Sequence, residues 1–135
     1  MSEYSYFFDT TVIVHYFQKN QASKIYIDRL LSGDAKAATS TITELELWVG
    51  IKEDEVERHE ALLSLLEIVD LDSHIARQAG KIFSQFRTQG VGIPDAIIAA
   101  SAKIKGNELI TGNHKHFESL HNQGIVECEF LSQGI

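Results

Sequence analysis

G-V-G-I-P-D-A-I-I-A-A-S-A, residues 90–102, is the stretch around which the rest of this chain can be arranged. Gly90 and Gly92 interrupt the segment before it, and Pro94, the only proline, suits the first turn of a helix because its φ is fixed near the helical value. Asp95 follows in that first turn, where the helix dipole favours a carboxylate. The small apolar residues after it predict a tightly packed helix with an acid at its start. Such an acid can be a simple helix cap or one member of a functional site.

Segments typical of strands alternate with segments of helical periodicity along the whole chain. This alternation predicts βαβ units, and therefore one α/β domain over residues 1–135, with a mostly parallel sheet between two layers of helices. Residues 111–117 are expected to form a polar turn anchored by Phe117, and Ile42, Leu45 and Val49 are expected to be the apolar stripe of one helix. Strands are predicted over residues 4–8, 36–39, 67–71, 107–111 and 125–130, and helices over 10–18, 22–31, 40–50, 72–90 and from Pro94 onward.

Composition excludes several classes of protein. With 135 residues, of which 44% are hydrophobic, the chain can bury a sizeable core. It carries 12 Lys and Arg against 19 Asp and Glu, and this net charge of −7 argues against a protein that simply coats nucleic acid. The single cysteine, Cys128, fits a reducing cytosol. We see no signal peptide and no apolar run long enough to span a bilayer, so we expect a cytoplasmic protein without a membrane partner.

Polar positions from four parts of the chain are predicted to meet where the parallel strands end, which is where ligands bind in open α/β sheets. Asp9 follows the first strand, and residues 111–113 follow another. Glu44 and Asp95 lie in the first turns of two helices, although Glu44 could instead close a capping box with Thr41. Converging carboxylates need a proton or a divalent cation between them. Hard oxygen donors favour Mg²⁺ or Mn²⁺, which binds phosphate oxygens and activates a water.

Four segments taken together resemble the PIN-domain family, in particular the VapC-type toxins of toxin–antitoxin pairs. The resemblance covers essentially the whole chain and implies a Mg²⁺- or Mn²⁺-dependent endoribonuclease that acts on tRNA or another structured RNA. It also implies a homodimer that a VapB-like antitoxin holds inactive. The segments are F-F-D-T-T-V-I-V (7–14), T-I-T-E-L-E (41–46), I-P-D-A-I-I-A-A-S-A (93–102) and L-I-T-G-N-H-K-H-F (109–117).

Carried over residue by residue, the resemblance assigns Asp9, Glu44 and Asp95 as the three acidic metal ligands. It makes the hydroxyl of Thr10 or Thr11 the support of the first ligand, and it matches Thr111 to the hydroxyl of the last motif.

The last segment departs from the acid-rich form of the family. Asn113 stands where many relatives have Asp, and His116 stands where Asp or Glu often precedes the Phe. An amide oxygen is a weaker, neutral ligand, so the three acids are expected to hold one metal ion, or two with the help of Asn113. His116 can position a water, transfer a proton or contact phosphate, or it can be simply solvated.

Two other classes of function remain open at this point. One is a phosphatase with Asp9 as nucleophile, although the haloacid-dehalogenase type requires a second Asp where this chain has Thr11. The other is a PIN-like domain without catalysis that acts as a binding module. Tyr16, Phe17 and Trp48 are candidates for contact with an antitoxin or a second copy, and core packing is the simpler expectation for each.

Overall fold

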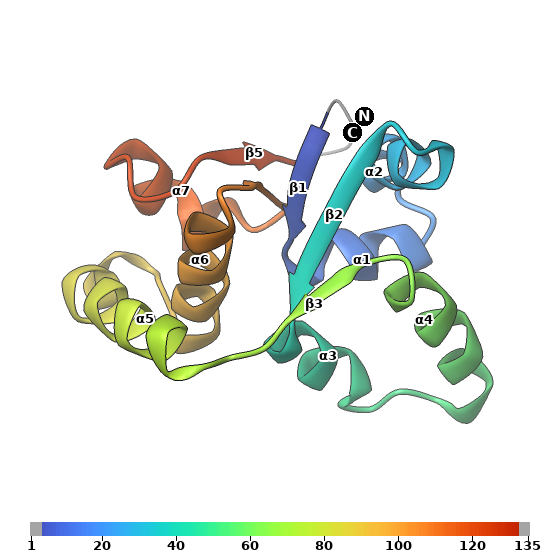
Figure 1. Ribbon diagram of the computed structural model, residues 1–135, viewed down its shortest axis with the longest axis horizontal. Helices are drawn as coiled ribbons and strands as arrows, with labels where there is room; N and C mark the ends of the chain where they lie inside the picture. The colour runs from blue at the N-terminus through green and yellow to red at the C-terminus, as the bar shows by residue number, and fades with distance from the viewer. Residues whose placement is uncertain (1–3, 133–135) are drawn as a thin grey trace.

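The structure, a computed structural model, describes residues 4–132. Within these residues, five parallel strands form one sheet at the centre of the molecule (Figure 1). The strand order is β3-β2-β1-β4-β5, so the first strand lies in the middle and pairs with β2 on one side and with β4 on the other. In this register Phe7 lies opposite both Ala38 and Leu109. The strands are β1 (Tyr4–Phe8), β2 (Ala35–Ser40), β3 (Glu67–Val69), β4 (Glu108–Thr111) and β5 (Cys128–Phe130).

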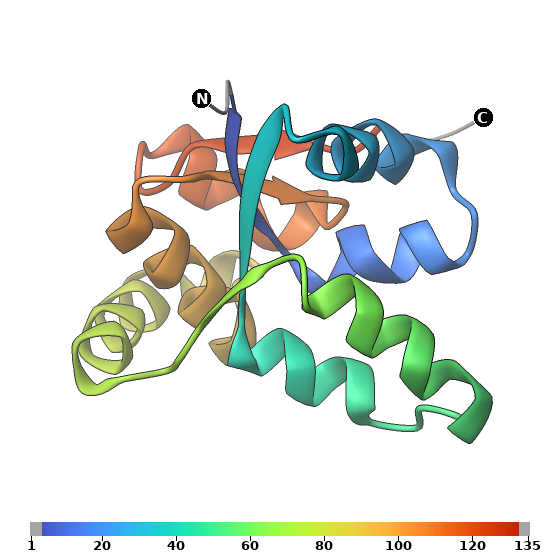
Figure 2. The same ribbon diagram turned by 45° about the vertical axis from the view of Figure 1, so that its right-hand side comes forward.

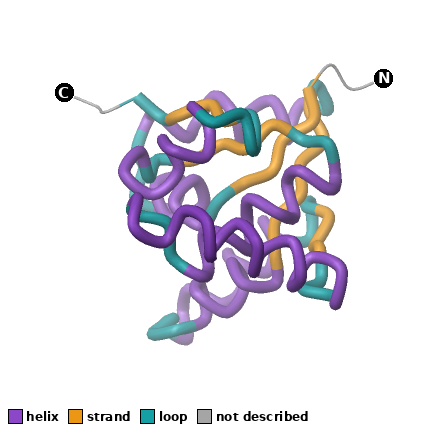
Figure 3. The backbone as a smooth tube through the Cα atoms, turned by 90° about the vertical axis from the view of Figure 1, so that its left-hand side faces the viewer, coloured by secondary structure: helices purple, strands orange, loops and turns teal. Residues whose placement is uncertain are grey.

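Helices cover both faces of this sheet, as Figures 1 and 2 show from two directions and Figure 3 from the side. Successive side chains of a strand point to opposite faces. Phe7 accordingly packs in one apolar cluster with α5, α6 and α7, whereas Tyr6 and Phe8 pack in a second cluster with α1, α2, α3 and α4. The predicted three-layer α/β/α architecture is therefore confirmed. The helices are α1 (Thr10–Phe17), α2 (Gln21–Ser32), α3 (Thr41–Trp48), α4 (Val56–Leu63), α5 (Ser73–Phe86), α6 (Ile93–Lys105) and α7 (His114–Asn122), with short 3₁₀ turns η1 (Glu53–Glu55) and η2 (Arg87–Gln89).

The helix that carries Pro94 in its first turn, α6, lies between α5 and the sheet. Every residue from Asp95 to Ala102 is buried, which the small side chains permit because they let neighbouring elements approach closely. Gly92 is its N-cap, and Gly106 ends it in the left-handed conformation with φ 72°. The chain thus delivers Asp95 into the interior at the start of a rigid, fully packed helix.

Two predictions about local structure are wrong. Instead of a polar turn over residues 111–117, the chain begins helix α7 at His114. Its sequence is mostly polar, so the only strong periodic signal is the buried pair Phe117 and Leu120, three residues apart on one face.

The predicted apolar stripe of α3 is also wrong. Leu45 and Val49 are 59% and 73% exposed, and the buried residues of this helix are Thr43 and Leu47. Because one of the core positions is a threonine, a pattern based only on apolar residues does not identify the buried face of this helix.

None of the helices within residues 4–132 is both long and apolar enough to cross a membrane.

Candidate active site

A cleft of about 340 Å³ opens where β1 and β4 end and where α1 and α6 begin. This is the edge at which open parallel sheets bind their ligands. The cleft wall comes from five separate parts of the chain, namely the start of α1, the end of α3, the start of α6, the loop after β4 and the first turn of α7. Its lining residues are Asp9, Thr10, Thr11, Val14, His15, Glu46, Gly92, Pro94, Asp95, Asn113 and His116.

Asp9 is the most enclosed acid of the cleft, with 4% of its surface exposed. Its Oδ2 accepts hydrogen bonds from the hydroxyl of Thr11 at 2.8 Å and from that of Thr111 at 2.7 Å. Burial raises the pKa of the Asp9 carboxyl, the two hydroxyls oppose this effect, and the negative charge of Asp95 raises the pKa further. A positive charge in the cleft would therefore favour the ionised form of Asp9. Of the two threonine hydroxyls expected to support this acid, that of Thr11 donates to Asp9, whereas that of Thr10 donates to Glu46.

Asp95 is both a helix cap and a residue of the cleft. Its Oδ2 accepts the backbone N–H of Gly92 at 2.8 Å, the bond of a capping box, so the simpler interpretation of this acid is correct. The same oxygen lies 3.0 Å from Nδ1 of His116. Because both contacts use Oδ2, they fix the orientation of the carboxylate toward the cleft.

The third acid of the cleft is Glu46, and not Glu44. Glu46 Oε1 accepts a hydrogen bond from the hydroxyl of Thr10 at 2.6 Å. Thr10 Oγ1 also lies 3.0 Å from the hydroxyl oxygen of Thr43. Because the single hydroxyl hydrogen of Thr10 points to Glu46, Thr43 is the donor of this second hydrogen bond. Residues two apart on a helix point about 200° away from each other. Glu44 therefore cannot share the face of α3 that Thr43 and Glu46 turn toward α1, and it does not line the cleft.

The capping interpretation of Glu44 is wrong as well. Helix α3 is capped by Ser40, whose hydroxyl accepts the backbone N–H of Ile42 at 3.1 Å. The hydroxyl of Thr41 instead accepts the backbone N–H of Leu71 at 3.3 Å. Thr43 and Glu46, three residues apart, share one face of α3, and this spacing is the feature of the sequence that matches the acid lining the cleft.

Asn113 and His116 close the cleft on the side of α7. Asn113 Nδ2 and His116 Nδ1 lie 3.0 Å apart, and this same nitrogen is the one beside Asp95. When His116 Nδ1 carries a hydrogen and donates it to Asp95, it cannot accept a hydrogen bond from Asn113 Nδ2. The Asn113 amide then has to be turned so that its oxygen, and not its nitrogen, faces the ring. The backbone N–H of Asn113 donates to Thr111 Oγ1 at 3.0 Å, which links this corner to the Thr111–Asp9 bond.

His15 lines the cleft although no pattern in the sequence pointed to it. Its Nδ1 is buried and has no hydrogen-bond partner among residues 4–132. The ring packs against Gly112, where an added Cβ would lie 3.0 Å from His15 Cε1. A larger residue at position 112 would have to displace this ring, so the glycine of the T-G-N segment makes room for a side chain of the cleft wall.

The donors of the cleft suit a hard divalent cation, since they comprise three carboxylates and an amide oxygen and include no thiolate. As they stand, no three Asp, Glu, His or Cys side chains within residues 4–132 form a group that could hold a metal ion. Asp9 and Asp95 are buried and fixed, whereas Glu46 is exposed and is tied within the described structure only to Thr10. Glu46 is thus the acid that has to move for the three to converge.

Comparison with known proteins gives concordant results. The PIN domain family model matches residues 6–121. Ribonuclease VapC1 of Methanocaldococcus jannaschii is 37% identical over 120 residues, which cover 87% of this chain and 82% of that protein. Ribonuclease VapC19 of Mycobacterium tuberculosis is 30% identical over 111 residues, or 81% of this chain and 89% of that protein. Among solved structures, a chain of VapBC2 from Rickettsia felis, bound to a promoter DNA fragment, aligns with a TM-score of 0.75 and 25% identity over 95% of this chain and 99% of that one.

Proposed function

Because this chain belongs to the PIN-domain family, we propose that it is a divalent-metal-dependent endoribonuclease and the toxin of a toxin–antitoxin pair. The observation that carries the proposal is that Asp9, Glu46 and Asp95 reach one cleft from three separate elements. The relatives described above are ribonucleases by name, and they match this chain over most of its length. A homodimer, which the resemblance implies, stays a prediction.

The proposed ligands of Mg²⁺ or Mn²⁺ are Asp9, Glu46 and Asp95, with Asn113 assisting. A divalent cation bound there would offset the repulsion of the carboxylates, stabilise charge on a phosphodiester and activate a water for its hydrolysis. Glu46 contributes the mobile carboxylate, because its exposed side chain can turn from Thr10 toward the two fixed aspartates. The two aspartates contribute fixed oxygens, since each is held through Oδ2 by the protein itself.

The neighbouring polar groups act on these acids. Thr11 and Thr111 hold Asp9, so its Oδ1 is the oxygen available to a ligand, and the N–H of Gly92 does the same for Asp95. His116 is 45% exposed and touches Asp95 through Nδ1. We assign His116 the task of orienting Asp95 while its other ring nitrogen contacts a phosphate oxygen. The alternative of an aspartate-based phosphatase lacks support, because Thr11 occupies the position of the second acid and donates to Asp9.

The test is cleavage of a mixed pool of tRNA and other structured RNA by antitoxin-free protein in Mg²⁺, in Mn²⁺ and in EDTA. We expect discrete products that require metal and disappear in Asp95→Asn, whose amide oxygen can still accept the Gly92 N–H and preserve the cap. Asp70→Asn is the matched control, since Asp70 is exposed and lies outside the cleft. Equal cleavage by Asp95→Asn and Asp70→Asn, with both proteins folded by circular dichroism, would contradict the assignment.

The antitoxin is proposed to lie in a groove between α1, α3 and α4 that adjoins the cleft. This groove of about 280 Å³ shares Val14 and Glu46 with the cleft, so a segment bound along it reaches the proposed metal ligands. It is lined by Val49, the C-cap residue of α3, which is 73% exposed, and Leu45 and Trp48 are exposed beside it on α3. Apolar side chains beside acids suit a partner segment that is apolar with a basic residue near its end.

Trp48 offers a direct measurement of this binding, because it is the only tryptophan and is 38% exposed. Titration with the antitoxin should shift its emission to shorter wavelength as the indole leaves water. The Val49→Asp protein should still cleave RNA but resist inhibition, since this side chain lines the groove, is 73% exposed and can be replaced without disturbing the core. Inhibition of Val49→Asp at the wild-type antitoxin concentration would refute this placement.

A further inference from the structure

Helix α5 carries an unbalanced positive charge in an otherwise acidic chain. Residues 73–89, which comprise α5 and η2, contain three of the 12 basic residues, Arg77, Lys81 and Arg87, and no Asp or Glu. The rest of the chain sets nine basic residues against 19 acids, so a segment of charge +3 stands against a remainder of −10. All three basic side chains are exposed.

Among residues 4–132, none of the three forms an ion pair. Arg77 and Lys81 stand four residues apart, so the two cations lie about one helical turn from each other along α5. Because neither neutralises an acid of the described structure, both are available to an external anion.

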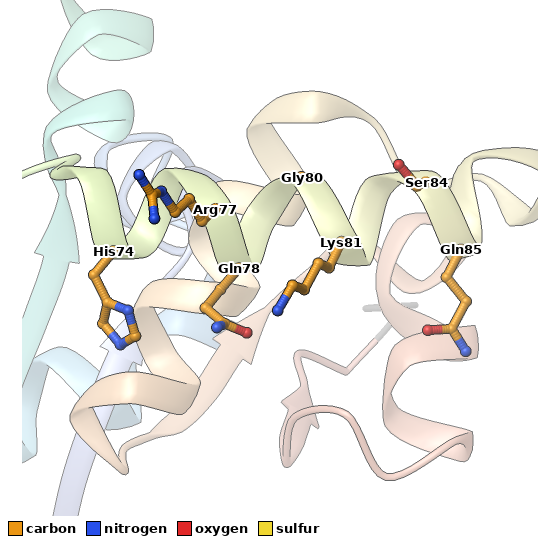
Figure 4. A pocket seen from close by; sticks show the side chains of 7 residues that line it. All are labelled: His74, Arg77, Gln78, Gly80, Lys81, Ser84 and Gln85. Atoms are coloured by element: carbon orange, nitrogen blue, oxygen red, sulfur yellow. The ribbon is translucent and has the colours of Figure 1, made fainter.

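A shallow depression, widely open to solvent, lies along the outer surface of α5 and is lined by residues of this helix alone. In Figure 4, Lys81 extends to one side of this depression together with His74, Gln78 and Gln85, while Arg77 and Ser84 extend to the other. The surface therefore offers two cations together with amide and hydroxyl groups that donate hydrogen bonds, and no carboxylate.

Gly80 lies in the middle of this depression. A glycine inside a helix lowers its stability relative to alanine, yet an added Cβ at position 80 would meet nothing within 4 Å. Packing therefore does not require the glycine. Its effect is to leave the helix backbone open to close approach between Arg77, Lys81 and Ser84.

The far end of α5 leads to the cleft. After η2 the chain turns at Gly90, where an added Cβ would lie 2.7 Å from the backbone oxygen of Lys115, between Asn113 and His116. Two residues later, Gly92 begins the helix that carries Asp95. A long ligand that follows α5 toward Arg87 thus arrives at the wall of the cleft.

We propose that this α5 basic face, defined by Arg77, Gln78, Lys81, Ser84 and Gln85, docks the sugar–phosphate backbone of the RNA substrate outside the cleft. The inference rests on the proposed ribonuclease function. Cations with amide and hydroxyl donors match phosphate and ribose oxygens, and such contacts position a nucleic acid without reading its bases. The face compensates locally for the charge of −10 on the rest of the chain, which repels RNA.

The test compares two double variants with the same change of charge. Arg77→Gln/Lys81→Gln removes the proposed contacts, and Lys36→Gln/Lys52→Gln removes two exposed basic residues outside α5. Each lowers the net charge from −7 to −9. Binding of a fluorescein-labelled tRNA transcript is followed by anisotropy in EDTA, so that the readout does not depend on cleavage, over about 50 to 200 mM KCl.

We expect the α5 variant to bind the transcript on the order of 10-fold more weakly at low salt, with a slope of log affinity against log salt shallower by about 1.5. The control variant should retain the wild-type slope. With Mg²⁺ or Mn²⁺ present, the α5 variant should raise KM for the transcript and leave cleavage of a hexanucleotide, too short to span α5 and the cleft, unchanged.

Three results would overturn the proposal. The first is equal binding by the two variants, and the second is an α5 variant that binds RNA normally but loses affinity for the antitoxin, which would make the face a protein contact. The third is a change in molecular mass by light scattering, which would make it an interface between copies. Failure of the proposed function is distinguishable, because a chain that never cleaves RNA can still show the difference in binding.

Discussion

Replacing Glu46 and Glu44 in parallel tests which of two neighbouring acids belongs to the active site. Glu46→Gln removes one of three carboxylate charges from the cleft, while the amide oxygen can still accept the Thr10 hydroxyl that Glu46 accepts at 2.6 Å. The side chain is exposed, so the free energy of unfolding should change by no more than about 0.5 kcal/mol. Loss of a group that merely supports a metal ligand costs about 10- to 100-fold in activity. Loss of a ligand itself should therefore lower kcat/KM by at least about 100-fold.

The assay is the initial rate of RNA cleavage at saturating Mg²⁺ or Mn²⁺, with urea unfolding of each protein as the control for stability. Glu44→Gln should stay within about 2-fold of wild type, because its side chain leaves α3 on a different face. The reasoning would be refuted by a Glu44→Gln protein that loses activity while Glu46→Gln keeps it, since the acids would then act in the opposite order. Loss of activity in both variants without loss of stability would refute the distinction between them.

Two further predictions concern stability. Burial, a hydrogen bond with Glu129 and nearby negative charges raise the pKa of Glu108 to about 7. The stability that this group contributes is therefore complete below about pH 4.5 and is lost as the pH rises through 7. Between pH 5 and pH 8, urea unfolding should show a smaller loss of stability in Glu108→Gln than in wild type, and the exposed control Glu118→Gln should behave as wild type. Gly80→Ala should raise the free energy of unfolding by about 0.5 to 1 kcal/mol and Tm by about 2 to 4 °C. Alanine favours the helix more than glycine does, and the added methyl group meets nothing within 4 Å. An unchanged or lower Tm in a calorimetric scan would contradict this.

The fold was predictable because its signals are local and mutually consistent. The strand over residues 4–8 places Tyr6 and Phe8 on one face and Phe7 on the other, and both faces of the sheet are indeed covered. Gly90 and Gly106 bound the segment that its proline and its small apolar residues predicted as a helix, and α6 lies between them. The helix α7 was missed because a polar sequence with one buried pair carries too little periodicity to distinguish it from a turn.

The site was predictable in part. Asp9 directly follows a strand, and Asp95 lies in the first turn of a helix that a proline marks, so their places in the fold follow from the chain itself. Glu44 and Glu46 lie on one short helix whose true inner face contains a threonine, and T-x-x-E spacing occurs twice in succession. The same ambiguity hid the burial of Thr43 and the exposure of Leu45.

The sequence by itself determined the layers, the parallel order of local units and two of the three acids, because periodicity and helix boundaries depend on near neighbours in the chain. Only the tertiary structure decided which glutamate joins them, since that depends on the rotation at which α3 packs against α1 and on the hydroxyls of Thr10 and Thr43 that meet there. It likewise brought His15 against Gly112, a contact between residues nearly a hundred positions apart. Such contacts leave no periodic trace in the sequence, because they arise where separate elements pack against each other.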